Sequence, residues 1–102
     1  MYKDTYQAGF EWDEAKNEAN RRKHRLDFET ARGIFGGPIL TWVDSRHDYG
    51  EMRSGAIGQT DGMTLVVIFT HRRGSVRIIS ARKANRHERN IYEEAIAAIE
   101  RG

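Results

Sequence analysis

Three strand-like segments separated by two tight-turn signals place the strongest constraint on how this chain folds. The segments span residues 52–59, 65–69 and 76–81, with Asp61-Gly62 and Arg73-Gly74 between them. Residue pairs that end in glycine favour the short turns of β-hairpins. Strands joined by such turns pair with their neighbours, so the pattern predicts an antiparallel sheet. Every residue of 65–69 is apolar, which predicts a central strand that is covered on both faces.

The residues before these strands favour two helices and two further short strands. Asp13 is a suitable N-cap for a helix that ends near His24, and Asp27 is a suitable N-cap for a short second helix. Residues 9–12 and 39–43 have the pattern of short strands.

The last segment predicts an amphipathic helix. Asn85 is its expected N-cap, and Glu88 lies three residues further on, where its side chain completes a capping box. Helices must cover the apolar faces of the sheet, so we expect an α+β domain with the order strand, helix, helix, four strands, helix. The buried stripe of the last helix is expected to contain Ile91, Tyr92, Ala95, Ala98 and Ile99.

Composition narrows the class of protein. The chain has 102 residues, of which 38% are hydrophobic and 31% charged, and this fits one globular domain with residues 1–8 as a loose lead-in. No apolar run approaches the roughly 20 residues of a membrane span, and no signal-peptide pattern is present, so we expect a cytoplasmic protein without a membrane partner. The absence of cysteine excludes disulfides and thiolate metal sites. His47 with Asp44 and Asp48 is a triplet common in loops, so we expect no metal and no cofactor.

Positive charge is concentrated in residues 72–89. The formal net charge of the chain is only +2, yet this segment has seven basic residues against one acidic residue, Glu88, which gives a local balance of +6. Such a distribution predicts a surface for a polyanion such as RNA. Solvated helix faces are the alternative explanation for a charge run. The basic residues are Arg72, Arg73, Arg77, Arg82, Lys83, Arg86 and Arg89.

The end of the last strand and the start of the last helix have the groups of a phosphate-binding site. Strict alternation along the strand places Arg77 and Lys83 on one side and Arg82 on the other. The helix start adds free N–H groups, with Arg86 and Arg89 on one helix face. Arginine suits this task because its planar fork matches phosphate oxygens.

Two residues are candidates for proton transfer beside this phosphate site. Glu51 and Arg53 share one strand face, so the carboxylate can accept a proton from a ribose 2′-hydroxyl while an arginine or lysine stabilises the phosphorane. His71, at the end of the central strand, is a candidate general acid. The structural alternatives are a plain ion pair between Glu51 and Arg53 and a hydrogen-bonded histidine at position 71.

Short motifs follow one another through most of the chain in a recognisable order. They are Phe10-Glu11-Trp12-Asp13, Arg22-Lys23-His24, Asp48-Tyr49-Gly50-Glu51 and the run 77–84, followed by Arg86, Glu88 and Arg89. Between Phe10 and Glu94 the chain thereby resembles the BrnT family, the ribonuclease toxins of type II toxin–antitoxin systems. Asn85 differs from the Ser or Thr that is frequent there in the family, and it caps a helix equally well.

The resemblance implies a RelE-like α+β fold and a metal-independent endoribonuclease that cleaves RNA and arrests translation. It also implies a partner antitoxin that is BrnA-like and has a ribbon–helix–helix part. The toxin is expected to reach operator DNA only as a complex with this antitoxin, and the complex is expected to repress its own operon. Trp12 and Trp42 are candidate anchors for this partner, and either can instead be a core residue. The residues predicted to be catalytic are Arg53, Arg77, Arg82, Lys83, Glu51 and His71, and those predicted to bind RNA are Arg72, Arg73, Arg86 and Arg89.

Two other functions fit the same residues. One is a catalytically inactive module that tunes the DNA binding of an antitoxin. The other is a plain DNA- or RNA-binding domain, which would show a salt-dependent affinity for nucleic acid.

Overall fold

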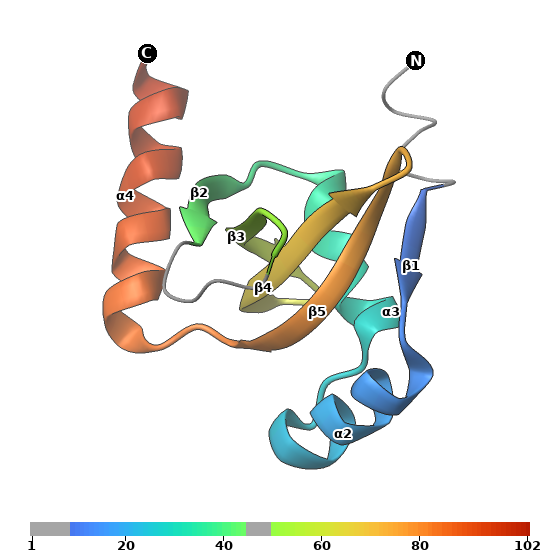
Figure 1. The fold of residues 1–102 in the computed structure, drawn as a ribbon. Coiled ribbons are helices and arrows are strands. Elements are labelled where there is room, and N and C mark those ends of the chain that lie inside the picture. Colours follow the sequence, from blue (N-terminus) through green and yellow to red (C-terminus); the bar gives the residue numbers. More distant parts are fainter. Residues whose placement is uncertain (1–8, 45–49) are drawn as a thin grey trace.

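A five-stranded sheet with helices around it forms the fold in the computed structural model, which describes residues 9–44 and 50–102 (Figure 1). The α+β class and the order of the elements confirm the sequence prediction. The predicted lead-in 1–8, His47 and Asp48 lie outside the described residues. The strands are β1 (Phe10–Trp12), β2 (Leu40–Asp44), β3 (Arg53–Thr60), β4 (Met63–Arg72) and β5 (Ser75–Lys83). The helices are α2 (Glu14–His24), α3 (Phe28–Ala31), the 3-10 helix η1 (Arg32–Gly36) and α4 (Arg86–Arg101).

The sheet order is β1-β5-β4-β3-β2, so the three strands predicted from the turn signals form its centre. Asp61 and Arg73 have φ angles of 51° and 54° in the two connecting turns, and a glycine follows each of them. One prediction needs correction, because β1 pairs with β5 in parallel and the sheet is therefore mixed. Parallel pairing requires a long connection, and α2, α3 and the other strands between β1 and β5 provide it.

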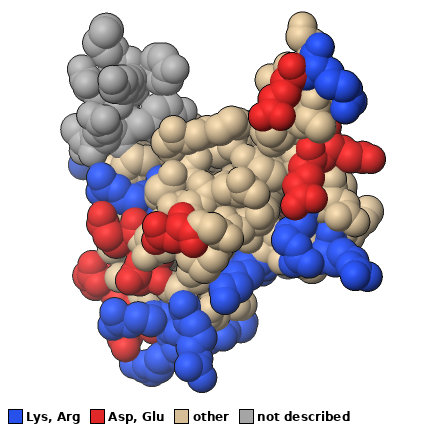
Figure 2. Space-filling model, turned by 180° about the vertical axis from the view of Figure 1, so that it is seen from behind, with Lys and Arg blue, Asp and Glu red and all other residues tan. Residues whose placement is uncertain are grey.

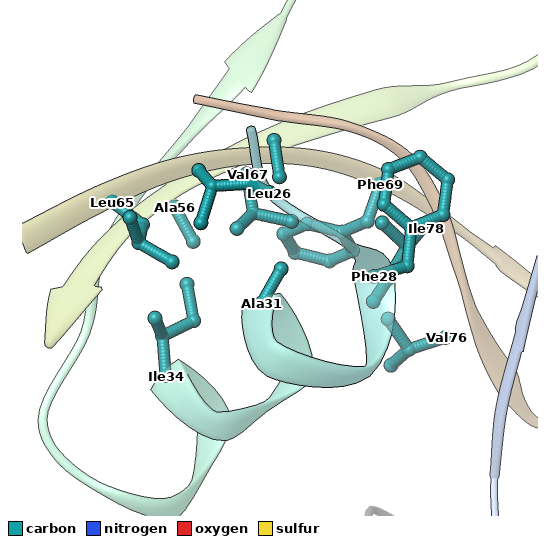
Figure 3. Close-up of a cluster of buried hydrophobic side chains, with 11 residues drawn as sticks. Leu26, Phe28, Ala31, Ile34, Ala56, Leu65, Val67, Phe69, Val76 and Ile78 are labelled. Carbon is teal, nitrogen blue, oxygen red and sulfur yellow. The ribbon is translucent and has the colours of Figure 1, made fainter. Parts of the chain in front are cut away.

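The helices α3 and η1 cover one face of the sheet, which we call the covered face, and α2 lies at its β5 edge. Phe28, Ala31 and Ile34 follow one another at intervals of three residues, point towards the strands and are 0% exposed (Figure 3). Burial of a large apolar side chain of this kind contributes roughly 1.5–3 kcal/mol, so these contacts fix the helices on the sheet. The strands supply Ala56, Leu65, Val67, Phe69, Val76, Ile78 and Ala81 to the same cluster.

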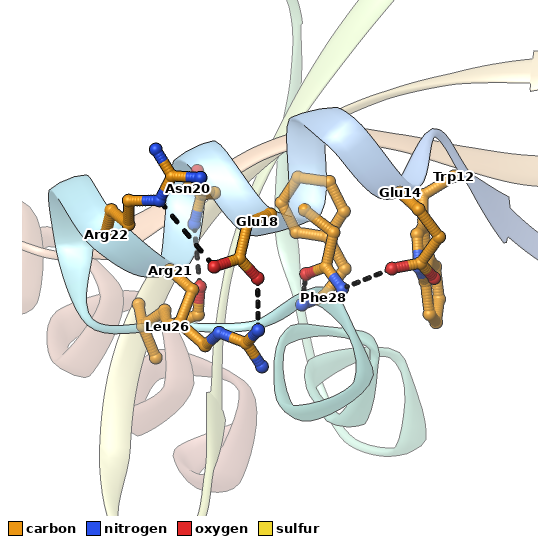
Figure 4. Close-up of polar contacts among 9 residues, drawn as sticks. Trp12, Glu14, Glu18, Asn20, Arg21, Arg22, Leu26 and Phe28 are labelled. Atoms are coloured by element: carbon orange, nitrogen blue, oxygen red, sulfur yellow. Dashed lines mark hydrogen bonds and ion pairs between the residues drawn. The ribbon is translucent and has the colours of Figure 1, made fainter.

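A polar side chain, rather than an apolar stripe, attaches α2 to the sheet. Asn20 is the buried residue of this helix, whereas Ala15 and Ala19 are exposed. Its side-chain Nδ2 donates to the carbonyls of Leu26 and Ala81 at 3.0 and 2.9 Å, and its Oδ1 accepts from the Ala81 N–H at 3.1 Å. Figure 4 shows Asn20 on the side of α2 that faces Leu26. Strand β1 pairs with β5 only as far as Ile78. The Asn20 amide provides hydrogen-bond partners for β5 further along, at Ala81.

Helix α4 covers one end of the opposite face, which we call the open face. Tyr92 is buried with Ile57 and Val66, and its hydroxyl donates to the Pro38 carbonyl at 2.8 Å. The predicted buried stripe is wrong at its ends, since Ile91 is 41% and Ile99 70% exposed, and Ala98 is exposed too. For Ala98 and Ile99 the reason is that the C-terminal part of α4 extends past the strands, which leaves no sheet for it to cover (Figure 1).

Candidate nucleic-acid interface

A β-bulge between β4 and β5 determines which side chains share the open face. Ile68 pairs with Ser80, whereas the next residue, Phe69, pairs with Ile78. Ile79 is thus an extra residue on β5. An extra residue reverses the alternation of side chains on the two sides of the bulge.

The bulge brings Arg77 and Arg82 to the same face. Thr70 pairs with Arg77 and Val66 pairs with Arg82, and residues 66, 68 and 70 of β4 all point to the open face. The prediction from strict alternation, which separated these two arginines and grouped Arg77 with Lys83, is therefore wrong. Lys83 pairs with Leu65 and projects to the side of the covered face.

A row of polar and charged residues crosses all five strands at one end of the open face. Asp44 of β2 pairs with Arg53 of β3, and Thr70 of β4 pairs with Arg77 of β5, which in turn pairs with Glu11 of β1. The register of β3 and β4 continues the row from Arg53 to Thr70. Arg53 and Arg77, far apart in the sequence, are therefore separated on this face by a single strand.

Carboxylates hold the arginines of this row in place. The Arg77 Nη1 donates to Glu11 Oε2 at 2.9 Å, and the Arg53 Nε donates to Glu51 Oε2 at 3.3 Å. Arg72 Nη2 lies 4.0 Å from the other Glu51 oxygen. The ion pair between Glu51 and Arg53, which the sequence offered as the structural alternative to a catalytic role, is thus present, with Glu51 two residues before the start of β3. A guanidinium has five N–H donors, so a group fixed in this way can still bind a phosphate.

Arg82 is held by the first turn of α4. Its Nη1 and Nη2 each donate to a different oxygen of Glu88 at 2.8 Å, and the backbone N–H of Asn85 also donates to this carboxylate at 2.9 Å. The predicted capping box is confirmed, because the Asn85 side chain accepts from the Glu88 N–H. The hydrogen bond from Arg82 is the main cause that lowers the pKa of Glu88 from 4.5 to about 2, and the bond from Asn85 adds to it. Glu88 therefore stays ionised near neutral pH.

A cleft of about 340 Å³ lies on the open face between β2 and the start of α4. Trp42 and Asp44 line it from β2, and Arg82 and Glu88 line it from the opposite side. Its apolar lining includes Val66 and Ile68, whereas its rims are charged. The apolar floor suits a flat nucleotide base, and Arg82 is the group on the rim that can bind its anionic phosphate, whereas Asp44 and Glu88 are acidic.

Other residues predicted for the site lie away from this cleft. His71 pairs with Val76 and rests against the Phe69 ring, with 5.7 Å between the ring centroids, so it is on the side of the covered face. Arg73 lies in the β4–β5 turn. Arg86 is exposed at the start of α4, where the Arg89 Nη1 donates to the Ala84 carbonyl at 3.0 Å.

The early basic cluster of the sequence forms a separate surface. The last turn of α2 contains Arg21, Arg22 and Lys23, and both arginines contact Glu18 (Figure 4). Seen from the side opposite to Figure 1, blue side chains gather over the end of α2 and again near the start of α4, with a largely uncharged area between them (Figure 2). The positive charge of the chain is therefore divided among several patches.

The sequence alone did not identify Glu11, Thr70 and Ser80 as neighbours of the site. Their place follows from the cross-strand register, which brings Glu11 to Arg77 and Ser80 to the cleft. Asp44 was considered only as a metal ligand, yet it is 6% exposed and lines the cleft. The signal available in the sequence was the alternation of residues 40, 42 and 44 on β2, which puts Trp42 and Asp44 on one face.

The fold and this face define a small α+β domain whose arginine-lined sheet surface suits a phosphate polymer. Residues 12–88 match the family described as the ribonuclease toxin, BrnT, of type II toxin–antitoxin systems. The chain therefore belongs to the BrnT family of ribonuclease toxins, as the sequence motifs predicted. The matched region contains Arg53, Arg77 and Arg82. A search of curated proteins gives no match. Within the described residues, no helix has the length and apolar character needed to cross a membrane.

Proposed function

We propose that this protein is an endoribonuclease that cleaves RNA without a metal ion, and that the open face is its active site. The observation that supports this most is the β-bulge, because it places Arg77 and Arg82 on the same face as Arg53. Three guanidinium groups on one sheet face can hold and polarise the phosphates of an RNA strand. Membership of a family of ribonuclease toxins gives this arrangement its substrate class.

The proposed reaction uses the RNA's own 2′-hydroxyl as the nucleophile. Glu51 accepts the hydroxyl proton, and the 2′-oxygen bonds to the adjacent phosphorus. The bond to the 5′-oxygen breaks, so the products are a 2′,3′-cyclic phosphate and a 5′-hydroxyl that takes its proton from water. Arg53 and Arg77 stabilise the charge that develops on the phosphorane oxygens.

The geometry favours Glu51 over His71 as the residue that takes part in proton transfer. Glu51 contacts Arg53, whereas His71 projects to the side of the covered face. Lys83 projects to that side as well, so the proposal gives neither His71 nor Lys83 a direct part in the chemistry. Glu51 is also close to Arg72, which places a second cation beside the proton acceptor.

The remaining cations extend the RNA path at the two ends of the site. Arg72 and Arg73 lie at the end of β4 and in the turn that follows, and Arg86 and Arg89 lie at the start of α4. We propose that they bind backbone phosphates on either side of the cleaved bond. Contacts of this kind add affinity that falls with increasing salt and carry little sequence information.

A BrnA-like antitoxin completes the proposal. The family belongs to type II toxin–antitoxin systems, in which a protein partner neutralises the toxin. We propose that this partner has a ribbon–helix–helix part and that the toxin reaches operator DNA only through it, so that the complex represses its own operon. The unbound toxin acts on RNA in the cytoplasm and arrests translation.

Cleavage of end-labelled RNA by the purified protein, with and without EDTA, tests the reaction. We expect cleavage to persist in EDTA and to leave 2′,3′-cyclic phosphate ends. Loss of cleavage in EDTA and its return with a divalent cation would contradict the metal-independent mechanism. No cleavage under either condition, together with salt-dependent binding to duplex DNA, would instead support a plain nucleic-acid-binding domain.

Arginine-to-alanine variants test the location of the site. We expect Arg53→Ala, Arg77→Ala and Arg82→Ala each to lower cleavage by roughly 100-fold or more, the scale for loss of one preorganised charge-stabilising group. Arg22→Ala on α2 is the matched control, because it removes the same side chain from a surface outside the site. Circular dichroism and thermal unfolding check that each variant is folded. A folded Arg82→Ala protein that still degrades RNA and arrests growth would show that the site is misplaced.

A further inference from the structure

Trp42 occupies the part of the open face next to the charged row. It pairs with Gly55 of β3, and Gly55 pairs in turn with Ile68 of β4. This row lies two residues along the strands from Arg53, a distance of roughly 6–7 Å. Trp42 remains 39% exposed in spite of its size. The indole is therefore a large aromatic surface directly beside the proposed phosphate-binding arginines.

The absence of a side chain at position 55 gives the indole its support. A Cβ atom at Gly55 would lie 2.3 Å from Cε2 and Cζ2 of the indole and 2.8 Å from Nε1. These distances are too short for any real contact, so the ring lies directly against the backbone of β3. One side of the ring is thus fixed by the sheet, and Trp42 also lines the cleft that Arg82 closes on the opposite side.

We propose that Trp42 is the platform on which a base of the RNA stacks, next to the phosphate at which the strand is cleaved. This inference rests on the proposed function. Proteins bind single strands by combining cations for the backbone with aromatic rings for the bases. Here the ring and the guanidinium groups of Arg53 and Arg82 belong to the same face, so one nucleotide can place its base on the ring and its phosphate against an arginine. Stacking tolerates every base, so Trp42 adds affinity and position rather than a strict sequence preference.

An apolar anchor for a protein partner is the competing role for Trp42. Anchors of that kind sit in the centre of an interface that is depleted of charge. The surroundings of Trp42 differ, because Asp44, Arg82 and Glu88 line the same cleft. The charged rim therefore differs from the centre of a protein interface, and the apolar floor next to the cation Arg82 fits the base and the phosphate of a nucleotide.

Fluorescence of Trp42 gives a direct test. The chain has two tryptophans, so Trp12→Phe leaves Trp42 as the single emitter. This variant is titrated with a 2′-O-methyl RNA oligonucleotide, which cannot be cleaved, and with an abasic oligonucleotide of equal length and charge. We expect the first to quench the emission and the second to bind without quenching. Anisotropy of a labelled oligonucleotide measures the binding of each.

Affinity changes in variants separate stacking from phosphate binding. We expect Trp42→Ala to bind the base-containing oligonucleotide at least about tenfold more weakly and the abasic one as wild type does. Trp42→Phe is expected to lose less, since it keeps a ring. Gly55→Ala keeps the tryptophan but displaces it from the strand, so it is expected to behave like Trp42→Ala. Thr41→Ala is the matched control, because Thr41 is exposed on the same strand, pairs with Ala56 of the covered face and is not among the residues that line the cleft.

The outcomes distinguish this inference from the proposed function. Equal quenching by both oligonucleotides, or unchanged affinity of Trp42→Ala, would overturn the stacking role and leave the protein anchor as the explanation. Cleavage of unmodified RNA by wild type in parallel shows whether the ribonuclease function stands in that case. If wild type neither cleaves RNA nor binds the oligonucleotide, the function and the stacking role both fail.

Discussion

Arg82 of β5 and Glu88 of α4 are joined by two parallel hydrogen bonds of 2.8 Å each. The same carboxylate caps the helix through the N–H of Asn85. One acidic side chain thus connects the end of a strand, the start of a helix and the cleft. This connection means that the orientation of Arg82 and the first turn of α4 are set together.

The contribution of Glu88 to the free energy of unfolding should depend on pH. The pKa of Glu88 in the folded protein is about 2, below the ordinary value of 4.5, so its ionised form stabilises the fold. This contribution is complete above the unfolded-state pKa of 4.5 and is lost as the pH falls from there to about 2. We expect Glu88→Gln to be less stable than wild type by roughly 1 kcal/mol near neutral pH. As the pH falls from 4.5 to about 2, this difference in stability should vanish. Urea unfolding at a series of pH values measures it, and a difference that is constant with pH would contradict the assignment.

The Asn85 side chain should contribute to stability as the N-cap of α4. Asn85→Ala removes the side chain that accepts from the Glu88 N–H at 2.8 Å. Loss of such a cap costs about 1 kcal/mol, so we expect a lower urea midpoint with an unchanged slope. Asn85→Ser, which keeps a capping oxygen, is the control and should stay close to wild type. If the two variants unfold alike, the cap does not contribute as the geometry indicates.

The buried amide of Asn20 should tolerate no replacement by a carboxylate. Asn20→Asp keeps an acceptor for the Ala81 N–H but turns an oxygen towards the carbonyls of Leu26 and Ala81, which now receive no hydrogen bond. We expect a loss of about 2–3 kcal/mol or more, measured by chemical unfolding. Asn17→Asp is the matched control on the same helix, because an aspartate can still accept from the Phe28 N–H, and the bond it loses, from Asn17 Nδ2 to Glu14 at 3.2 Å, is exposed and contributes little. An equally small effect at both positions would argue against the buried network.

A charge exchange between β1 and β5 tests whether Arg77 serves only as an ion-pair partner. Glu11 and Arg77 are direct neighbours in parallel register and lie 2.9 Å apart at their closest atoms. The double variant Glu11→Arg with Arg77→Glu keeps the pair but moves the cation to the edge strand. We expect stability within about 0.5 kcal/mol of wild type, since exposed pairs contribute little, and RNA cleavage as low as in Arg77→Ala. Wild-type cleavage by the exchanged protein would reduce Arg77 to a structural role.

Features set by neighbouring residues were predictable from the sequence. Asp13, Asp27 and Asn85 cap the three α-helices as expected, because capping depends on residues at most three positions away. The turns at Asp61 and Arg73 were likewise evident from the glycine that follows each of them. Such local rules suffice to define the α+β class and the order of the elements.

Features that depend on how distant segments meet could not be predicted in this way. The bulge at Ile79 is visible only in the register of β4 and β5, and it changes the face on which Arg77 lies relative to Arg82. The parallel pairing of β1 and the exposure of Ile99 depend on where β1 and α4 are placed in space. The position of His71 follows from the same register, so the candidate site was predictable in its residue types but only partly in its geometry.

The hydrogen bonds of Asn20 have a consequence for how this protein behaves at high concentration. Strand β1 pairs with only a short stretch of β5, and an uncovered strand edge is a template on which other chains can add strands. At Ala81 both the N–H and the carbonyl are already engaged by the Asn20 amide. An intruding strand finds neither group available there, so a single asparagine on a polar helix protects this edge of the sheet against aggregation.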